Sequence, residues 1–128
     1  MPFKIFPEKE FELGTVIKEL EEKTAEVMKE NGGLYEKLGK ISVLQDSLEK
    51  LRRKEANGWK TITLKELVEM VDQHYKDARN ALVHGVASEE LHTIWRASYR
   101  FSLKWLNAIL DRFGEENEQS KVEYGIIG

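Results

Sequence analysis

The placement of its prolines is the feature that most constrains how this chain can fold. The 128 residues contain two prolines, Pro2 and Pro7, and both lie at the N-terminus. A proline inside a helix removes a backbone hydrogen bond and clashes with the preceding turn. From Glu8 onward, therefore, no residue forbids long helices. Hydrophobic residues make up 41% of the chain, which is enough for the packed core of one domain.

Apolar residues after Glu8 recur at the spacings of amphipathic helices, and turn signals rich in glycine separate the periodic stretches. A capping box, Thr63 with Glu66, starts the third stretch. The pattern predicts no strand and four helices, at about 8–30, 34–55, 64–85 and 88–113. We expect a single all-α domain over residues 1–128, an up-and-down helical bundle. Residues 115–128 form a tail that either docks on the bundle or frays.

Composition and charge exclude several classes of protein. The chain has no cysteine, so it has no disulfide framework and no thiolate metal site. Its net charge is -3, whereas a broad nucleic-acid binder is usually basic, so any contact with RNA must come from a local patch. No apolar run approaches the roughly 18 residues of a membrane span, and the N-terminus lacks a secretory signal pattern. We expect a cytoplasmic protein with no membrane contact and no cofactor.

The segment Asp77–Gly85 carries the main chemical hypothesis, because it places Arg79 and His84 at the end of the third helix. Arginine can clamp a phosphodiester, and histidine can move protons near neutral pH. A step of five residues on an unbroken helix rotates by about 140°, so the two side chains converge only if the helix unwinds or turns back, or between two copies of the chain. Alternatively, Arg79 pairs with a carboxylate on a neighbouring helix and His84 caps its own.

The run Arg79-Asn80-x-x-x-His84 resembles the R-x(4–6)-H signature of HEPN domains, in which a polar residue often follows the arginine. The predicted small helical bundle also resembles that family. The resemblance implies a homodimer in which arginine and histidine of both copies share one cleft. It further implies a metal-independent endoribonuclease that leaves a 2′,3′-cyclic phosphate and a 5′-hydroxyl.

On this resemblance Arg79 orients the phosphate, His84 transfers protons, and Asn80 supports the phosphate or the histidine. A toxin or antiviral-defence role would follow, with a cognate antitoxin or regulatory protein as a further partner. One toxin branch of the family carries a tyrosine two residues after the histidine. Here that position is Val86, which argues against that particular pairing with a nucleotidyltransferase.

The predicted fourth helix carries a basic stripe at every fourth residue, formed by His92, Arg96, Arg100 and Lys104. Beside Arg79 and His84 such a stripe could follow an RNA backbone, with Tyr99 available to stack on a base. The alternative is a solvated helix face, and only proximity to His84 would favour RNA binding.

Two other classes of function stay open. The first is a non-catalytic HEPN-like module that binds a protein partner or a nucleotide. The second is an antitoxin-like adaptor whose narrow leucine stripe on the second helix meets another helix. We do not expect His74 to bind a metal, because no second ligand stands four residues away. The three tryptophans, Trp59, Trp95 and Trp105, are expected in the core.

Overall fold

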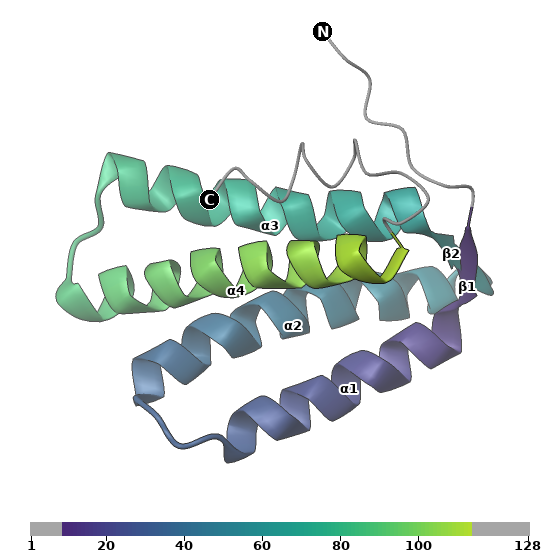
Figure 1. Ribbon diagram of the computed structural model, residues 1–128, viewed down its shortest axis with the longest axis horizontal. Helices are drawn as coiled ribbons and strands as arrows, with labels where there is room; N and C mark the ends of the chain where they lie inside the picture. The colour runs from purple at the N-terminus through teal and green to yellow at the C-terminus, as the bar shows by residue number, and fades with distance from the viewer. Residues whose placement is uncertain (1–8, 114–128) are drawn as a thin grey trace, which may run out of the picture.

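The computed structural model describes residues 9–113 of the chain, with all their side chains except those at 110, 112 and 113. These residues form four helices, and Figure 1 shows them running up and down alongside one another. The helices are α1 (Leu13–Lys29), α2 (Leu34–Ala56), α3 (Leu64–His84) and α4 (Glu89–Phe113). The predicted all-α helical bundle is therefore confirmed. The predicted tail over 115–128 lies outside the described residues.

The prediction that the chain has no strand is wrong for two short segments. Strand β1 (Glu10–Glu12) pairs antiparallel with β2 (Thr61–Thr63). The backbone N–H of Leu13 donates to Lys60 O at 2.9 Å, which extends the pairing to the first residue of α1. Helix α1 consequently begins at Leu13 rather than near Glu8. The two strands tie the starts of α1 and α3 together at one end of the bundle (Figure 1).

Helix α4 packs against both α2 and α3, whereas α1 packs mainly against α2. Thus α4 has two covered sides, and its side towards α1 is not closed by direct packing. The core gathers apolar residues from all four helices and from β2. Its fully buried members include Leu13, Val27, Val43, Leu44, Leu48, Leu51, Ile62, Leu64, Val68, Val71 and Leu106.

A glycine allows the close approach of α2 and α4. A Cβ atom added at Gly39 would lie 2.4 Å from Ile94 O, 2.7 Å from Ala97 Cβ and 2.9 Å from Ser98 N. Real Cβ atoms do not come so close to backbone atoms. Only glycine therefore allows the two backbones to meet at this point, and this contact fixes where α4 sits on α2.

The ends of α3 follow the capping chemistry of the sequence. The N–H of Glu66 donates to Thr63 Oγ1 at 3.1 Å, and the N–H of Thr63 donates to Glu66 Oε1 at 3.0 Å, so the predicted capping box is confirmed. The hydrogen bond from the backbone N–H of Thr63 lowers the pKa of the Glu66 carboxyl most, and hydrogen bonds from the Thr63 hydroxyl and from Lys54 lower it further. At the other end Gly85 has a φ of 83° and ends the helix after His84.

Candidate functional site

Arg79, Asn80 and His84 all lie exposed on the last two turns of α3. The helix is unbroken through His84, so it does not unwind near Leu82. Arg79 and His84 therefore leave the helix in directions about 140° apart. The two side chains therefore do not meet through unwinding of the helix within one chain. They could form a joint site only between two copies of the chain.

Arg79 lies over the ring of Tyr75, one turn earlier on its own helix. Its guanidinium carbon lies 5.8 Å from the centre of the Tyr75 ring, and that ring stacks on Tyr99 of α4 at 5.1 Å. Burial raises the pKa of the Tyr75 hydroxyl, the hydrogen bond with Tyr99 raises it further, and Arg79 lowers it. Within residues 9–113, no carboxylate forms an ion pair with Arg79. The exposed guanidinium is thus held beside Tyr75 by the ring face and by the hydroxyl.

Tyr99 takes part in this packing between α3 and α4. One face of its ring covers Tyr75, and the residue is only partly exposed. The contact places the predicted RNA-stacking residue against Tyr75, the residue over whose ring Arg79 lies. It also commits one ring face to α3, so that only the other face is left for a base.

His84 is the last residue of α3 and lies exposed beside Gly85. The same end of the bundle gathers nearly all the large apolar side chains that the described residues leave exposed. In Figure 1 it is the end where α1 and α3 finish and α2 and α4 begin. We call these side chains the apolar end: Met28, Leu34, Tyr35, Leu38, Val83 and Leu91.

The leucine stripe of α2 is divided by this arrangement. Leu44, Leu48 and Leu51 are buried in the core, while Leu34 and Leu38 are 64% and 41% exposed. The stripe therefore builds the bundle itself over its second half and contributes to the apolar end over its first.

The basic stripe of α4 lies on a different side of the molecule from Tyr99. Arg96, Arg100 and Lys104 line a groove of about 580 Å³, which we call the α1–α4 groove because those two helices form its walls. Glu36, Lys40 and Leu44 of α2 complete its lining. His92 is exposed one turn before Arg96, towards the start of the helix. The structure thus places Tyr99 against α3, on the ring that Arg79 also contacts, whereas Arg100 and Lys104 face the groove beside α1.

A buried polar chain that the sequence did not single out runs through the bundle. His74 is 8% exposed; its Nδ1 lies 3.3 Å from Asp46 Oδ2 of α2, and its Nε2 lies 2.8 Å from Ser98 Oγ of α4. Ser98 is 1% exposed and His74 is 8% exposed, so no substrate can reach the histidine–serine end of this chain. It joins three helices instead. The sequence signal that could have revealed this chain is the position of His74 on the buried face of α3, which it shares with Val71 and Tyr75.

The tryptophan prediction is wrong for Trp59, which is 54% exposed and lies under Lys54 Nζ at 5.1 Å from its ring centre. It sits in the turn after α2, where no helix covers it. Trp95 and Trp105 are partly buried, and Trp105 packs against the core. Among the described side chains no group of three His, Asp or Glu residues is placed to hold a metal ion.

Comparison of the chain with protein-family profiles, with curated proteins and with solved structures returns no match. Over the part of the chain that the structure describes, no helix is both long enough and apolar enough to cross a membrane. The functional argument consequently rests on the residues of this chain and on their placement.

Proposed function

We propose that the chain is a metal-independent endoribonuclease whose active site forms between two copies of the protein. The observation that carries the proposal is the placement of Arg79 and His84, both exposed on one continuous helix but about 140° apart. In a twofold dimer contacts are reciprocal, so an axis near the end of α3 pairs each Arg79 with the His84 of the other copy.

The apolar end supports an interface at this place. Val83 is 75% exposed and directly precedes His84, and Leu91 is 43% exposed at the start of α4. Apolar side chains gathered at one end of a small bundle typically mark a protein–protein contact. A contact made there would bury them around the Arg79 and His84 pairs.

In the proposed reaction, one His84 takes the proton of the RNA 2′-hydroxyl as the 2′-oxygen attacks the phosphorus. The bond from phosphorus to the 5′-oxygen breaks, and a second His84 gives its proton to that oxygen. Arg79 stabilises the charge that builds on the phosphate, and Asn80 donates a hydrogen bond to it. The products are a 2′,3′-cyclic phosphate and a 5′-hydroxyl. The two histidines of a dimer thus supply the base and the acid.

The test is cleavage of a labelled single-stranded RNA in the presence of EDTA. His84→Ala and Arg79→Ala should each lose about 100-fold or more in rate, in line with removal of a general acid–base or of a charge-stabilising donor. Arg53→Ala is the matched control, because Arg53 is an exposed arginine on α2 and should keep full activity. Equal cleavage by all four proteins would refute the assignment.

Mixing wild type with His84→Ala tests the composite site. A mixed dimer has one His84 and lacks either the base or the acid, so an equal mixture that exchanges subunits should keep about a quarter of the wild-type rate at the same total protein concentration. A rate of about one half, in a mixture shown to exchange subunits, would refute a site shared between copies.

A second candidate is a non-catalytic module that binds a protein through the apolar end. The exposure of Leu34 and Leu38 favours it, because an amphipathic partner helix could cover both. A well-folded dimer that leaves all RNA substrates intact would favour this function over the nuclease.

A further inference from the structure

The α1–α4 groove is a hollow lined by residues of three helices, and nothing in the proposed nuclease reaction uses it. Its floor is apolar: Leu20 of α1 is 5% exposed and Leu44 of α2 is fully buried. Phe101 and Trp105 of α4 line it as partly exposed rings, with centroids 6.4 Å apart. A volume of about 580 Å³ is in the usual range for small-molecule sites.

The α4 wall of the groove is purely cationic. Its charged residues are Arg96, Arg100 and Lys104, spaced one helical turn apart and so about 6 Å from one to the next along the axis. Within residues 9–113, none of the three forms an ion pair with a carboxylate. Three unneutralised cations in a row will bind an anion that has several charged groups in sequence.

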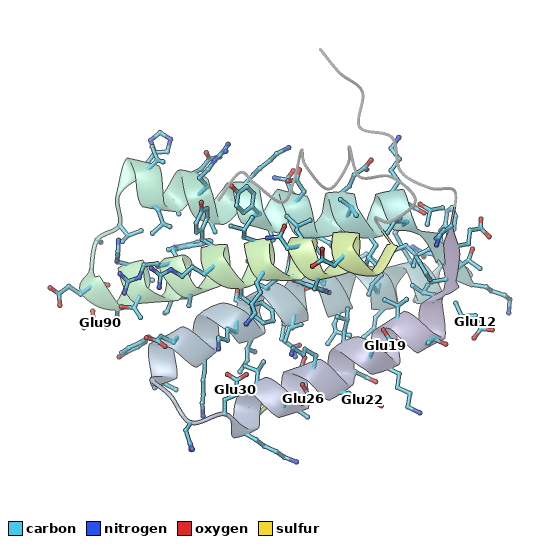
Figure 2. The ribbon with its side chains drawn as sticks, in the orientation of Figure 1. Glu12, Glu19, Glu22, Glu26, Glu30 and Glu90 are labelled. Atoms are coloured by element: carbon cyan, nitrogen blue, oxygen red, sulfur yellow. The ribbon has the colours of Figure 1, made fainter. Side chains whose placement is uncertain are left out.

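The opposite wall differs in charge. Glu19 and Glu30 mark the α1 side in Figure 2, and Glu36 lies at the start of α2. The two lysines of this wall are already engaged with acids: Lys40 Nζ lies 2.9 Å from Glu30 and Lys23 Nζ lies 3.5 Å from Glu26. The hydrogen bond from Lys40 lowers the pKa of Glu30, which keeps its carboxylate ionised. This wall therefore accepts hydrogen bonds and repels a ligand that is anionic on every side.

A ligand that suits both walls has phosphates along one edge, a flat apolar part in the middle and hydrogen-bond donors along the other edge. A nucleotide meets all three requirements: its phosphates face α4, its base lies against Phe101 and Trp105, and its ribose hydroxyls or amino groups face the carboxylates. A fatty acid lacks the donors, and a bare polyphosphate would meet the acidic wall.

We propose that the α1–α4 groove binds a nucleotide, either free or as one unit of an RNA strand, at a site separate from Arg79 and His84. The bound nucleotide bridges α1 and α4, which do not pack closely on each other. The site is independent of the proposed nuclease, because none of its residues takes part in the cleavage step.

The experiment is fluorescence polarisation of N-methylanthraniloyl-labelled ATP with the full-length protein at physiological salt. Unlabelled ATP should compete, and inorganic tripolyphosphate should compete at least about tenfold more weakly, because it has no base to stack. A single-stranded octaribonucleotide forms a third arm. If the oligonucleotide competes at a far lower concentration than ATP does, the natural ligand is an RNA strand. If ATP competes at the lower concentration, the natural ligand is a free nucleotide.

Variants locate the binding site. Arg100→Glu should weaken binding of labelled ATP by about tenfold or more, since it replaces a phosphate contact with a like charge. Lys65→Glu makes the same change of charge on α3, outside the groove, and should bind like wild type. Trp105→Leu should weaken binding by removing the stacking surface while keeping an apolar side chain. His84→Ala should leave binding unchanged whether or not the protein cleaves RNA.

Three results would overturn the proposal. The first is the absence of saturable binding of labelled ATP. The second is equal competition by tripolyphosphate and ATP, which would reduce the groove to a polyanion surface. The third is an equal loss of binding in Arg100→Glu and Lys65→Glu, which would place the effect in overall charge rather than in the groove. Both exposed-site variants are expected to fold, and circular dichroism checks this before binding is measured.

Discussion

Replacing Gly39 with alanine should destabilise the bundle, although the same change usually stabilises a helix. In a helix interior alanine is favoured over glycine by about 0.5–1 kcal/mol. At Gly39, however, the added Cβ would lie 2.4 Å from Ile94 O and 2.9 Å from Ser98 N. Both are backbone atoms of α4, so they cannot move aside as a flexible side chain would. The two helices must separate along their contact.

The magnitude follows from opposing effects. Overpacking of a well-packed site costs about 1–3 kcal/mol, and a clash with backbone atoms belongs at the upper end of that range. After the helix propensity gain is subtracted, we expect Gly39→Ala to lose about 2 kcal/mol of unfolding free energy.

Gly14→Ala is the matched control. Gly14 lies in α1, and a Cβ there would have its nearest neighbour, Glu55 Oε2, at 3.9 Å, an ordinary contact. Both substitutions change the unfolded chain equally, so their difference isolates the native contact. Gly14→Ala should be neutral or more stable than wild type by up to about 0.5 kcal/mol.

The assay is urea unfolding followed by far-ultraviolet circular dichroism. With a slope of about 2 kcal/mol per molar urea, the loss in Gly39→Ala moves the midpoint down by about 1 M. A Gly39→Ala protein as stable as wild type, with Gly14→Ala unchanged, would show that α2 and α4 do not meet at Gly39.

Three further predictions concern polar groups that hold α3 in place. Thr63→Ala should lose about 1 kcal/mol by removing the helix cap, measured by the same urea titration. Because the folded pKa of Glu66 is lowered, its stabilising effect is complete above the unfolded pKa and is lost as pH falls through the folded pKa. The advantage of wild type over Glu66→Gln in thermal unfolding should therefore shrink in acid, and a constant difference would contradict this. Ser98→Ala should cost about 1–3 kcal/mol by leaving buried His74 Nε2 unpaired, whereas Ser102→Ala, whose hydroxyl only donates to its own helix, should cost less.

The helices could be predicted from the sequence because their signals are local. Glycine ends, the Thr63 cap and apolar spacing each act within one or two turns, and the ends of α2, α3 and α4 fall within about two residues of the prediction. The strand pair could not be predicted in this way. Glu10–Glu12 is only three residues long, and its partner Thr61–Thr63 lies about 50 residues later in the chain, so no local pattern reveals the pairing.

The site residues show the same limit. Helical periodicity fixes the angle between two residues on one helix. It therefore gave the angle of about 140° between Arg79 and His84 correctly, because α3 is unbroken. It does not fix which neighbouring helix each face meets. Tyr99 and Arg100 are adjacent in sequence, yet one covers Tyr75 of α3 and the other faces the groove beside α1. That division depends on how α4 is seated, which only the packed structure specifies.

Helix α4 links the two proposed sites, so the variants should differ in what they disturb. It is seated on α2 through the Gly39 contact and on α3 through the bond of His74 with Ser98. A change of one surface side chain, such as Arg100→Glu, leaves this seating intact and should affect nucleotide binding without affecting RNA cleavage. Gly39→Ala moves the helix itself, and with it both the groove wall and the Tyr99 ring behind Arg79. If two separate sites lie on opposite sides of α4, Gly39→Ala should lose both nucleotide binding and RNA cleavage, Arg100→Glu should lose only binding, and His84→Ala only cleavage. If the protein instead has a single continuous RNA-binding surface, Arg100→Glu and His84→Ala should each lose both activities.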